Sequence, residues 1–415
     1  RPTANRPFQR KRALEAGVSP EEIFEATKID PWFIDQLQQI LEWETRFRDA
    51  ETVGPELLRR MKREGFSDRQ LAELRNEEEG EVRARRWGLG IHPTYNVVDT
   101  CAGEFPAETP YYYSSYEDES ESVPSEREKI VILGSGPNRI GQGIEFDYCC
   151  VHASYALRDA GFETIMVNCN PETVSTDYDT SDRLYFEPLT IEDVTNIIDA
   201  EQPVGIIVAF GGQTPLKLAG DLPEGLVVGT SPGSVDLAED REQWSALCAE
   251  IGIQQPPGGT AYDLAAARAI VDGIGFPVLV RPSYVLGGRA MQIVYDDAQL
   301  VLAMDELSEF GSLGIEGGLS SERPVLIDRF LEDATEVDVD AVRDHTGEVV
   351  IGAVMEHVEE AGVHSGDSAC VIPPPNLSDE VVGVIEGHTR RIAEALDVAW
   401  DTANNAVLDE GRRVL

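Results

Sequence analysis

Short apolar runs that alternate with helical segments dominate the middle of the chain and limit its fold most. The runs are KIVILG at 129–134, ETIMVNCN at 163–170, GIIVAFGG at 205–212 and LVVGTSP at 226–232. Strands separated by helices form βαβ units, and such units build parallel sheets. We therefore predict an α/β domain with a parallel sheet in this region.

The region before this domain has a helical pattern. Apolar residues from Phe8 to Trp87 recur at mixed spacings of three and four, and Asp30 followed by Pro31 is a good helix start. Two more helices are predicted at 55–64, closed by Gly65, and at 67–75. The acidic, proline-containing run EDESESVPSERE at 117–128 has the composition of an exposed linker, which puts a domain boundary near residue 125.

A third region begins near Ser234 with a helix whose first turn is predicted to be acidic. Strands are expected at 277–284, 291–296, 324–331, 335–342 and 348–358. The last three leave no room for helices between them, which indicates an antiparallel sheet. The third region therefore differs in kind from the second.

The charge of the chain excludes some partners. Acidic residues outnumber basic ones to give a net charge of −42, and only five residues are lysine. This balance argues against nucleic acid and against an anionic membrane surface. We interpret it as the salt-adapted surface of a halophilic protein, with an acidic docking surface as the alternative.

Cysteine usage and hydropathy indicate a cytoplasmic protein. The six cysteines form no CxxC pair, and no apolar run approaches the ~18 residues of a membrane span. We therefore expect reduced thiols and no membrane association.

Two glycine-rich motifs have the form of known functional loops. GSGPNRIGQG at 134–143 sits where a dinucleotide loop would, but Arg139 replaces the third glycine, and a close-packed turn is the other interpretation. GTSPG at 229–233 matches a nucleophile elbow around Ser231, yet no histidine shows a signature that ties it to this serine. We interpret GTSPG as a connecting turn.

Phosphate binding in this chain has to use arginine. No lysine follows a glycine, which excludes a Walker A loop. RPSYVLGGRAM at 281–291 offers Arg281, a glycine pair with free backbone N–H groups, and Arg289.

Carboxylates and histidines follow in the third region. In TEVDVDAV, strand alternation puts Glu336, Asp338 and Asp340 on one face, where they either meet solvent or bind ribose or a cation. MEHVEEAGVHSGDSA at 355–369 lacks the HExxH spacing of a zinc protease.

Taken together, these strings resemble one family, the large subunit of carbamoyl phosphate synthetase. The matching segments include 136–154, 170–188, 211–219, 238–242, 281–291 and 360–369. The resemblance runs from about Ala13 to Val398 and favours the second, carbamate-phosphorylating half of that subunit. It implies an α/β multidomain chain with a helical oligomerisation domain (1–125), a Rossmann-like pre-ATP-grasp domain (126–233) and a C-terminally incomplete ATP-grasp domain (234–415).

The resemblance also implies roles for individual residues. Arg241 and Arg281 would hold the ATP phosphates, and the loop at Gly287 and Gly288 would cover them. The adenosine would be bound by Arg329 and Leu331, largely through their backbone, by Glu336 at the ribose, and by Gly362, Val363, His364 and Ser365. His357 would lie near a monovalent cation such as K⁺.

Metal binding is where the chain departs from the family. Asn404 falls where the family has a metal-binding glutamine for Mg²⁺ or Mn²⁺, and the sequence stops at Leu415, before the family's glutamate and asparagine ligands. The start RPTANRPFQRKR is also unlike the family. We therefore expect a fragment whose 415 residues alone have negligible activity.

The implied reaction is transfer of the ATP γ-phosphoryl group to carbamate, which gives carbamoyl phosphate for arginine and pyrimidine biosynthesis. The implied partners are a glutaminase small subunit that supplies ammonia and further copies of the chain, bound through the helical domain. One alternative is a catalytically incomplete nucleotide-binding or assembly module. A biotin-dependent carboxylase is disfavoured by HSGDSA and by the helical domain.

Overall fold

The computed structural model describes residues 5–134, 145–282, 291–310, 324–359, 361 and 368–408. The chain divides into two compact units. One consists of Arg1–Lys129 with Ser154–Pro203, and the other of Ile130–Ala153 with Val204–Leu415. No helix among the described residues is long and apolar enough to cross a membrane.

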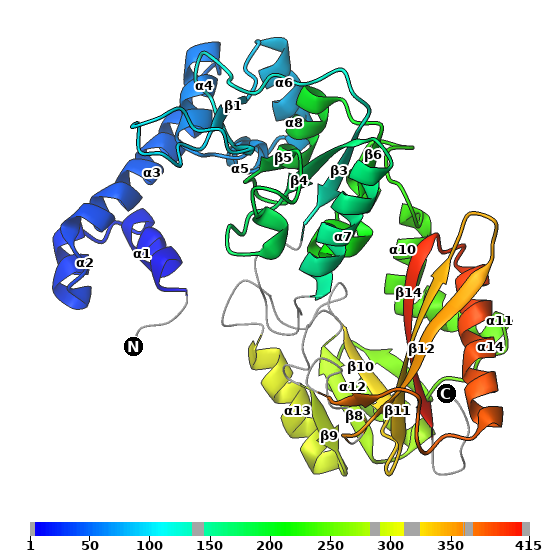
Figure 1. The fold of residues 1–415 in the computed structure, drawn as a ribbon. Coiled ribbons are helices and arrows are strands. Elements are labelled where there is room, and N and C mark those ends of the chain that lie inside the picture. Colours follow the sequence, from blue (N-terminus) through cyan, green and yellow to red (C-terminus); the bar gives the residue numbers. More distant parts are fainter. Residues whose placement is uncertain are drawn as a thin grey trace. The chain divides into compact units, whose positions relative to one another are not determined.

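The first unit begins with a series of helices (Figure 1). These are α1 (Arg6–Glu15), α2 (Pro20–Thr27), α3 (Pro31–Asp49), α4 (Pro55–Arg63), α5 (Asp68–Arg75) and α6 (Glu79–Gly88). The predicted start of α3 is confirmed, because the Asp30 carboxylate accepts a hydrogen bond from the Trp32 N–H and Pro31 is the first helical residue. The predicted helices at 55–64 and 67–75 are confirmed as α4 and α5, and Gly65 follows α4 with φ +89°.

A buried ion network stabilises the ends of α4, α5 and α6. Arg86 is fully buried and binds the Asp68 carboxylate through Nε and Nη2. Lys62 Nζ lies 3.2 Å from Asp68 and 2.5 Å from Glu192, a residue of α8 (Ile191–Glu201). Buried charges are tolerated when they are paired and hydrogen-bonded, so this network fixes the helices against α8.

The first unit also carries strands in the order β1-β2-β5-β4. They are β1 (Thr94–Val97), β2 (Tyr111–Ser115), β4 (Glu163–Val167) and β5 (Arg183–Tyr185). β1 and β2 are antiparallel, whereas β5 is parallel to both β2 and β4. The predicted strand at 163–170 is thus confirmed, while β1 and β2 were not predicted.

The acidic segment 117–128 is mostly exposed, as predicted, but it is also anchored. Arg183 Nη1 donates to Ser122 Oγ at 2.9 Å, and Arg183 Nη2 donates to the Val123 carbonyl. The Ser122 hydroxyl lies 3.0 Å from the Tyr185 hydroxyl. Side chains of β5 therefore hold a segment whose composition alone predicts a free linker.

The second unit contains the parallel pair β3 (Lys129–Leu133) and β6 (Gly205–Ile207). Helix α7 (Glu145–Asp159) follows β3 in the chain, and α9 (Gln213–Leu216), α10 (Pro232–Glu239) and α11 (Arg241–Glu250) follow β6. The predicted strand at 226–232 is wrong, because only an isolated bridge joins Ile206 and Val227. The predicted acidic helix start at Ser234 is also wrong, since α10 begins at Pro232 and its first turn contains no acidic residue.

An antiparallel sheet follows with the order β7-β10-β8-β9. Its strands are β7 (Gly258–Ala261), β8 (Val278–Pro282), β9 (Gln292–Val294) and β10 (Val325–Arg329). α12 (Leu264–Ile274) and α13 (Asp297–Phe310) cover one face, where Val278, Val280 and Ile327 are buried with Leu300. Arg281 and Asp328 lie on the other face of the sheet.

A second antiparallel sheet has the order β13-β12-β11-β14. Its strands are β11 (Thr335–Arg343), β12 (Val349–His357), β13 (Cys370–Val371) and β14 (Trp400–Leu408), and α14 (Asp379–Ala395) packs against it (Figure 1). The antiparallel pairing predicted for 335–358 is confirmed, but the prediction that the strand at 324–331 joins the same sheet is wrong. β10 packs with α12 and α13 whereas β11 packs with α14, and Asp333, with φ +51°, lies in the connection between the two strands.

Candidate functional site

Two arginines share one carboxylate on the face of the β7-β10-β8-β9 sheet opposite α12 and α13. Arg241 begins α11 and pairs with Asp328 Oδ1, and Arg281 of β8 has its Nε 3.8 Å from Asp328 Oδ2. The strand register places Arg281 opposite Leu326 and Leu279 opposite Asp328, so Arg281 and Asp328 lie on the same face. The structure thus brings together the two predicted phosphate-binding arginines.

The electrostatics of this cluster favour an anion. Burial lowers the pKa of Arg281; Asp328 opposes this shift and Arg241 adds to it. Two guanidinium groups against one carboxylate leave a positive excess, and Arg281 Nε is buried with no hydrogen-bond partner among the described residues. A phosphate oxygen would satisfy such a donor.

Asp328 is the residue of this cluster that the sequence interpretation missed. It lies in the run PVLIDR, where an acid interrupts an apolar strand next to an arginine. A charged residue in a buried strand is uncommon unless it is paired. The acid within this apolar run was therefore the sequence feature that could have indicated a paired residue at Asp328.

The adenine and ribose candidates lie between β10 and β11. The Arg329 guanidinium donates to the carbonyls of Ile274 and Phe276 at the C-terminal end of α12, which uses its charge to stabilise that helix end. Leu331 and Glu336 are half-buried on the connection and at the start of β11. Their contacts with adenosine stay predictions.

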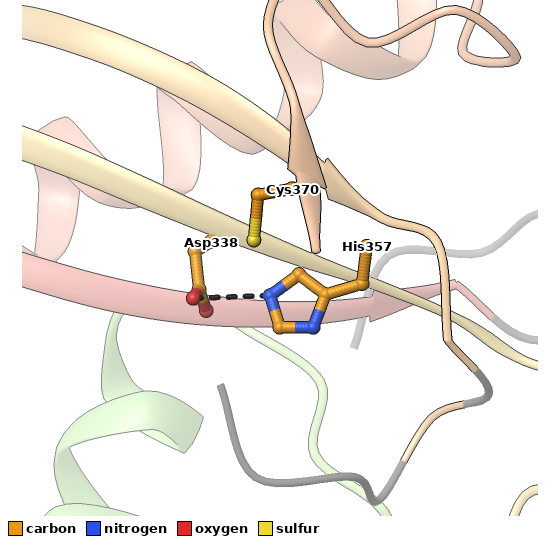
Figure 2. A group of neighbouring side chains, drawn as sticks. All are labelled: Asp338, His357 and Cys370. Carbon is orange, nitrogen blue, oxygen red and sulfur yellow. Dashed lines mark ion pairs between the residues drawn. The ribbon is translucent and has the colours of Figure 1, made fainter. Parts of the chain in front are cut away.

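The predicted alternation along β11 is confirmed. Val337 and Val339 are buried on the α14 side, so Glu336 and Asp338 face the other way. Asp338 Oδ2 lies 3.0 Å from Nε2 of His357 on β12, and Cys370 of β13 pairs with His357 in the strand register (Figure 2). Burial raises the pKa of the Cys370 thiol, and the Asp338 and Glu359 carboxylates add to this shift. The thiol is therefore not activated as a nucleophile.

Several predicted residues lie outside the described part of the chain. They are Gly287, Gly288, Gly362, Val363, His364 and Ser365. Most of the motif at 134–143 lies outside it as well. For Asn404 the backbone pairing with Val339 is described, and position 405 pairs with Asp338. Metal binding by Asn404 stays a prediction.

Ser231 has the structural role expected of a connecting turn. Its hydroxyl caps α10 by accepting a hydrogen bond from the Ser234 N–H. The neighbouring Thr230 hydroxyl donates to the Ala399 carbonyl at 3.1 Å and ties this turn to the segment before β14. No histidine contact with Ser231 is present among the described residues.

Solved structures with a similar fold define the class of protein. The biotin carboxylase domain of 2-oxoglutarate carboxylase from Hydrogenobacter thermophilus matches with a TM-score of 0.54 and 17% identity over 70% of this chain and 63% of that chain. N5-carboxyaminoimidazole ribonucleotide synthetase from Thermus thermophilus matches with a TM-score of 0.52 and 19% identity over 69% of each chain. At these identities the likeness establishes the fold alone. The fold class is that of proteins with an ATP-grasp domain, the ATP-binding fold that the sequence predicts for residues 234–415.

Domain models and close relatives identify the family. Three models match in succession: the carbamoyl-phosphate synthetase large chain oligomerisation domain at residues 1–90, the carbamoyl phosphate synthase preATP-grasp domain at 126–237 and the carbamoyl-phosphate synthase L chain ATP binding domain at 240–412. The carbamoyl phosphate synthase large chain of Archaeoglobus fulgidus is 56% identical over 405 residues, and that of Kineococcus radiotolerans 57% over 393. The chain belongs to the carbamoyl phosphate synthase large-chain family.

The matches cover nearly all of this chain but only part of the relatives. They include 96% of this chain and 37% of the A. fulgidus protein, and 93% and 35% for K. radiotolerans. The chain thus spans little more than a third of the length of these relatives. The domain boundaries near 125 and 233 stay predictions.

Proposed function

We propose that the protein to which this chain belongs phosphorylates carbamate with ATP and gives carbamoyl phosphate for arginine and pyrimidine biosynthesis. The observation that carries the proposal is the Arg241–Asp328–Arg281 cluster inside the segment that matches the ATP-binding domain. The name of the relatives supports carbamoyl phosphate as the product, and the two arginines of the cluster support binding of the ATP phosphates. We assign this chain to the carbamate-phosphorylating half.

The proposed chemistry depends on positioning and charge neutralisation. Phosphoryl transfer spreads negative charge over the moving group, and preorganised cations stabilise that charge. Arg281 would donate its unpartnered Nε–H to a phosphate oxygen, while Asp328 holds the Arg241 guanidinium beside it. Ammonia would come from a glutaminase small subunit of the same cytoplasmic enzyme.

Cations belong to the same proposal. The amide at Asn404 is an oxygen donor of the kind that Mg²⁺ or Mn²⁺ prefers, so Asn404 is our candidate to hold the metal. A bound Mg²⁺ would neutralise phosphate charge. K⁺ also prefers oxygen ligands, so we propose that it lies near His357 on oxygen donors and not on the imidazole.

The test is calorimetric titration of the chain with Mg·ATP in molar KCl. We expect binding that Arg281→Ala abolishes. Arg268→Ala is the matched control, because Arg268 forms an exposed pair with Asp297 and should leave binding unchanged. In the full-length enzyme, Arg281→Ala should lower carbamate-dependent ATP turnover by about 10²–10³-fold. Equal ATP affinity of the Arg281→Ala and Arg268→Ala chains would contradict the proposal.

An assembly role is the second candidate, and the first helices favour it. Trp32 and Phe33 at the start of α3 are 61% and 57% exposed, and Phe8 of α1 is 56% exposed. Exposed aromatic side chains in neighbouring helices are typical of protein interfaces. We propose that copies of the chain associate through these residues, in a segment that matches the oligomerisation domain.

Sedimentation velocity tests this assembly. The double substitution Trp32→Ser with Phe33→Ser should shift the chain to a smaller species with the helical content unchanged. Tyr148→Ser, at a side chain that is 51% exposed outside these helices, is the control. An unchanged sedimentation coefficient in the double variant would show that these rings do not form the contact.

A further inference from the structure

Three side chains of different chemistry meet on the face of the second sheet opposite α14. They come from three neighbouring strands: Asp338 from β11, His357 from β12 and Cys370 from β13. One carboxylate oxygen, one imidazole nitrogen and the thiol sulfur all lie within 4.8 Å of one another. Figure 2 shows the thiol and the carboxylate on the same side of the imidazole ring.

The buried part of this group has unused bonding capacity. His357 is 6% exposed, and its Nε2 has no hydrogen-bond partner among the described residues although Asp338 Oδ2 lies 3.0 Å away. Asp338 Oδ1 is also buried without a hydrogen-bond partner in the described part of the chain. Buried polar atoms in native proteins are nearly always satisfied, so two such atoms side by side require an explanation.

We propose that Asp338, His357 and Cys370 bind a divalent transition-metal ion of the Zn²⁺ class. Sulfur, imidazole nitrogen and carboxylate oxygen form a mixed donor set that Zn²⁺ accepts, whereas Mg²⁺ and K⁺ prefer oxygen alone. Bond lengths of about 2.0–2.3 Å in a tetrahedral site place the ligand atoms roughly 3.3–3.6 Å apart. Cys370 is exposed, so its side chain can close the remaining distance by rotation.

The bound ion joins three adjacent strands at one point. β13 consists of Cys370 and Val371, so only two of its residues pair with residues of β12. An ion held by all three strands binds the folded chain and not the unfolded one, and it therefore stabilises the fold by an amount that grows with the logarithm of its concentration above Kd. This role is separate from the proposed nucleotide chemistry, because neither arginine of the phosphate cluster takes part.

The experiment uses the whole chain without nucleotide, under a thiol-free reductant. Calorimetry with Zn²⁺ should give one tight site per chain, and Co²⁺ in its place should give a thiolate-to-cobalt absorption band. Cys370→Ala should remove that band and weaken Zn²⁺ binding by more than about 100-fold, because losing a direct ligand exceeds the 10–100-fold cost of losing its supporting contacts. Zn²⁺ should raise the melting temperature of the wild type and not of this variant.

Cys101→Ala is the matched control, since Cys101 is half-buried and belongs to no metal-ligand group among the described residues. It should bind Zn²⁺ and Co²⁺ as the wild type does. The exposed position of Cys370 keeps its variant folded, which circular dichroism checks, so the outcome does not depend on the buried His357. Equal Zn²⁺ affinity of the Cys370→Ala and Cys101→Ala chains, or a folded wild type that binds no Zn²⁺, would overturn the proposal. Unchanged ATP binding in Cys370→Ala would leave the proposed function standing.

Discussion

Gly258 and Asp328 face each other across the β7–β10 pair, and the space between them has no room for a side chain. A Cβ atom at Gly258 would collide with Asp328 Oδ1 and would lie 2.6 Å from the Ile327 carbonyl oxygen. The Asp328 carboxylate would have to move, and the β7 and β10 backbones would have to separate slightly at this point as well. Gly258 therefore keeps Asp328 where it can hold Arg241.

We expect Gly258→Ala to weaken Mg·ATP binding at least about tenfold, a loss of about 1.4 kcal/mol, because the displaced carboxylate no longer orients the arginines. Calorimetric titration measures this. Gly273→Ala is the control: Gly273 lies near the end of α12 with open space around its Cα, and alanine there should stabilise the helix by about 0.5–1 kcal/mol without affecting ATP. Full ATP affinity in Gly258→Ala would show that Asp328 does not position the arginines.

Sequence can propose single residues of a site where a side chain acts by its own chemistry. Arg281 was proposed because arginine is the residue type for phosphate in a chain without a Walker lysine, and Arg241 because the family resemblance implies it; phosphate binding by both stays a prediction. Asp328 was missed because its role is to hold another residue, and such a role depends on strand register that no local pattern encodes. Cys370 was missed for the same reason, since it meets His357 only through the pairing of β13 with β12.

At the scale of elements, a buried carboxylate joins β2 to the segment after β5. Glu187 is buried and accepts a hydrogen bond from the backbone N–H of Ser114 on β2. Burial raises the pKa of Glu187 from 4.5 to about 7; the Ser114 hydrogen bond opposes this shift and Asp193 adds to it. The unfolded chain therefore binds fewer protons than the folded one between these two pH values.

Stability should consequently fall as the pH rises from about 4.5 to about 7, by up to about 3 kcal/mol from this group. Glu187→Gln keeps the acceptor oxygen and removes the charge, so we expect it to flatten this dependence and to stabilise the first unit above pH 7. Urea unfolding at several pH values measures it. Glu172→Gln, at an exposed position, is the control. An identical pH slope in Glu187→Gln and the wild type would contradict this account.

Elements with strong local signals were predicted correctly, and those formed by distant contacts were not. α3, α4 and α5 carry their own start and stop residues, and the alternation of β11 follows from residue type. The run at 226–232 has strand composition but is joined to β6 by only an isolated bridge. β10 and β11 were assigned to one sheet because they are adjacent in sequence, whereas packing against different helices separates them.

At the scale of the whole molecule, the net charge of −42 is the dominant property. Like charges repel one another in the compact state more than in the extended chain, and salt screens this repulsion over a Debye length of about 3 Å at 1 M and 10 Å at 0.1 M. We propose that the surface is adapted to high salt.

The melting temperature of the chain should therefore rise by several degrees between about 0.1 M and 1 M KCl. Each kcal/mol gained in the free energy of unfolding raises the melting temperature by at least about 2 °C. Differential scanning fluorimetry measures this rise, and KCl should act as strongly as NaCl because screening depends on ionic strength. A melting temperature that does not change with salt would contradict this account of the acidic surface.

The sequence was sufficient for the family and for the order of its domains, because long strings of specific residues match. It was not sufficient for the anchoring of segment 117–128, whose composition predicts a free linker. Arg183 lies about 60 residues further along the chain, and only the fold brings it to Ser122. Contacts of this kind depend on topology rather than on local composition.

The Asp328 carboxylate also acts as an internal competitor for any anion that approaches Arg241 and Arg281. Chloride carries one charge and would replace only one contact, so it gains little by displacing a carboxylate that is already paired with Arg241. A polyphosphate carries several charges and can engage both arginines at once. We therefore expect the arrangement to discriminate between anions by valence, so that a nucleotide binds in preference to chloride.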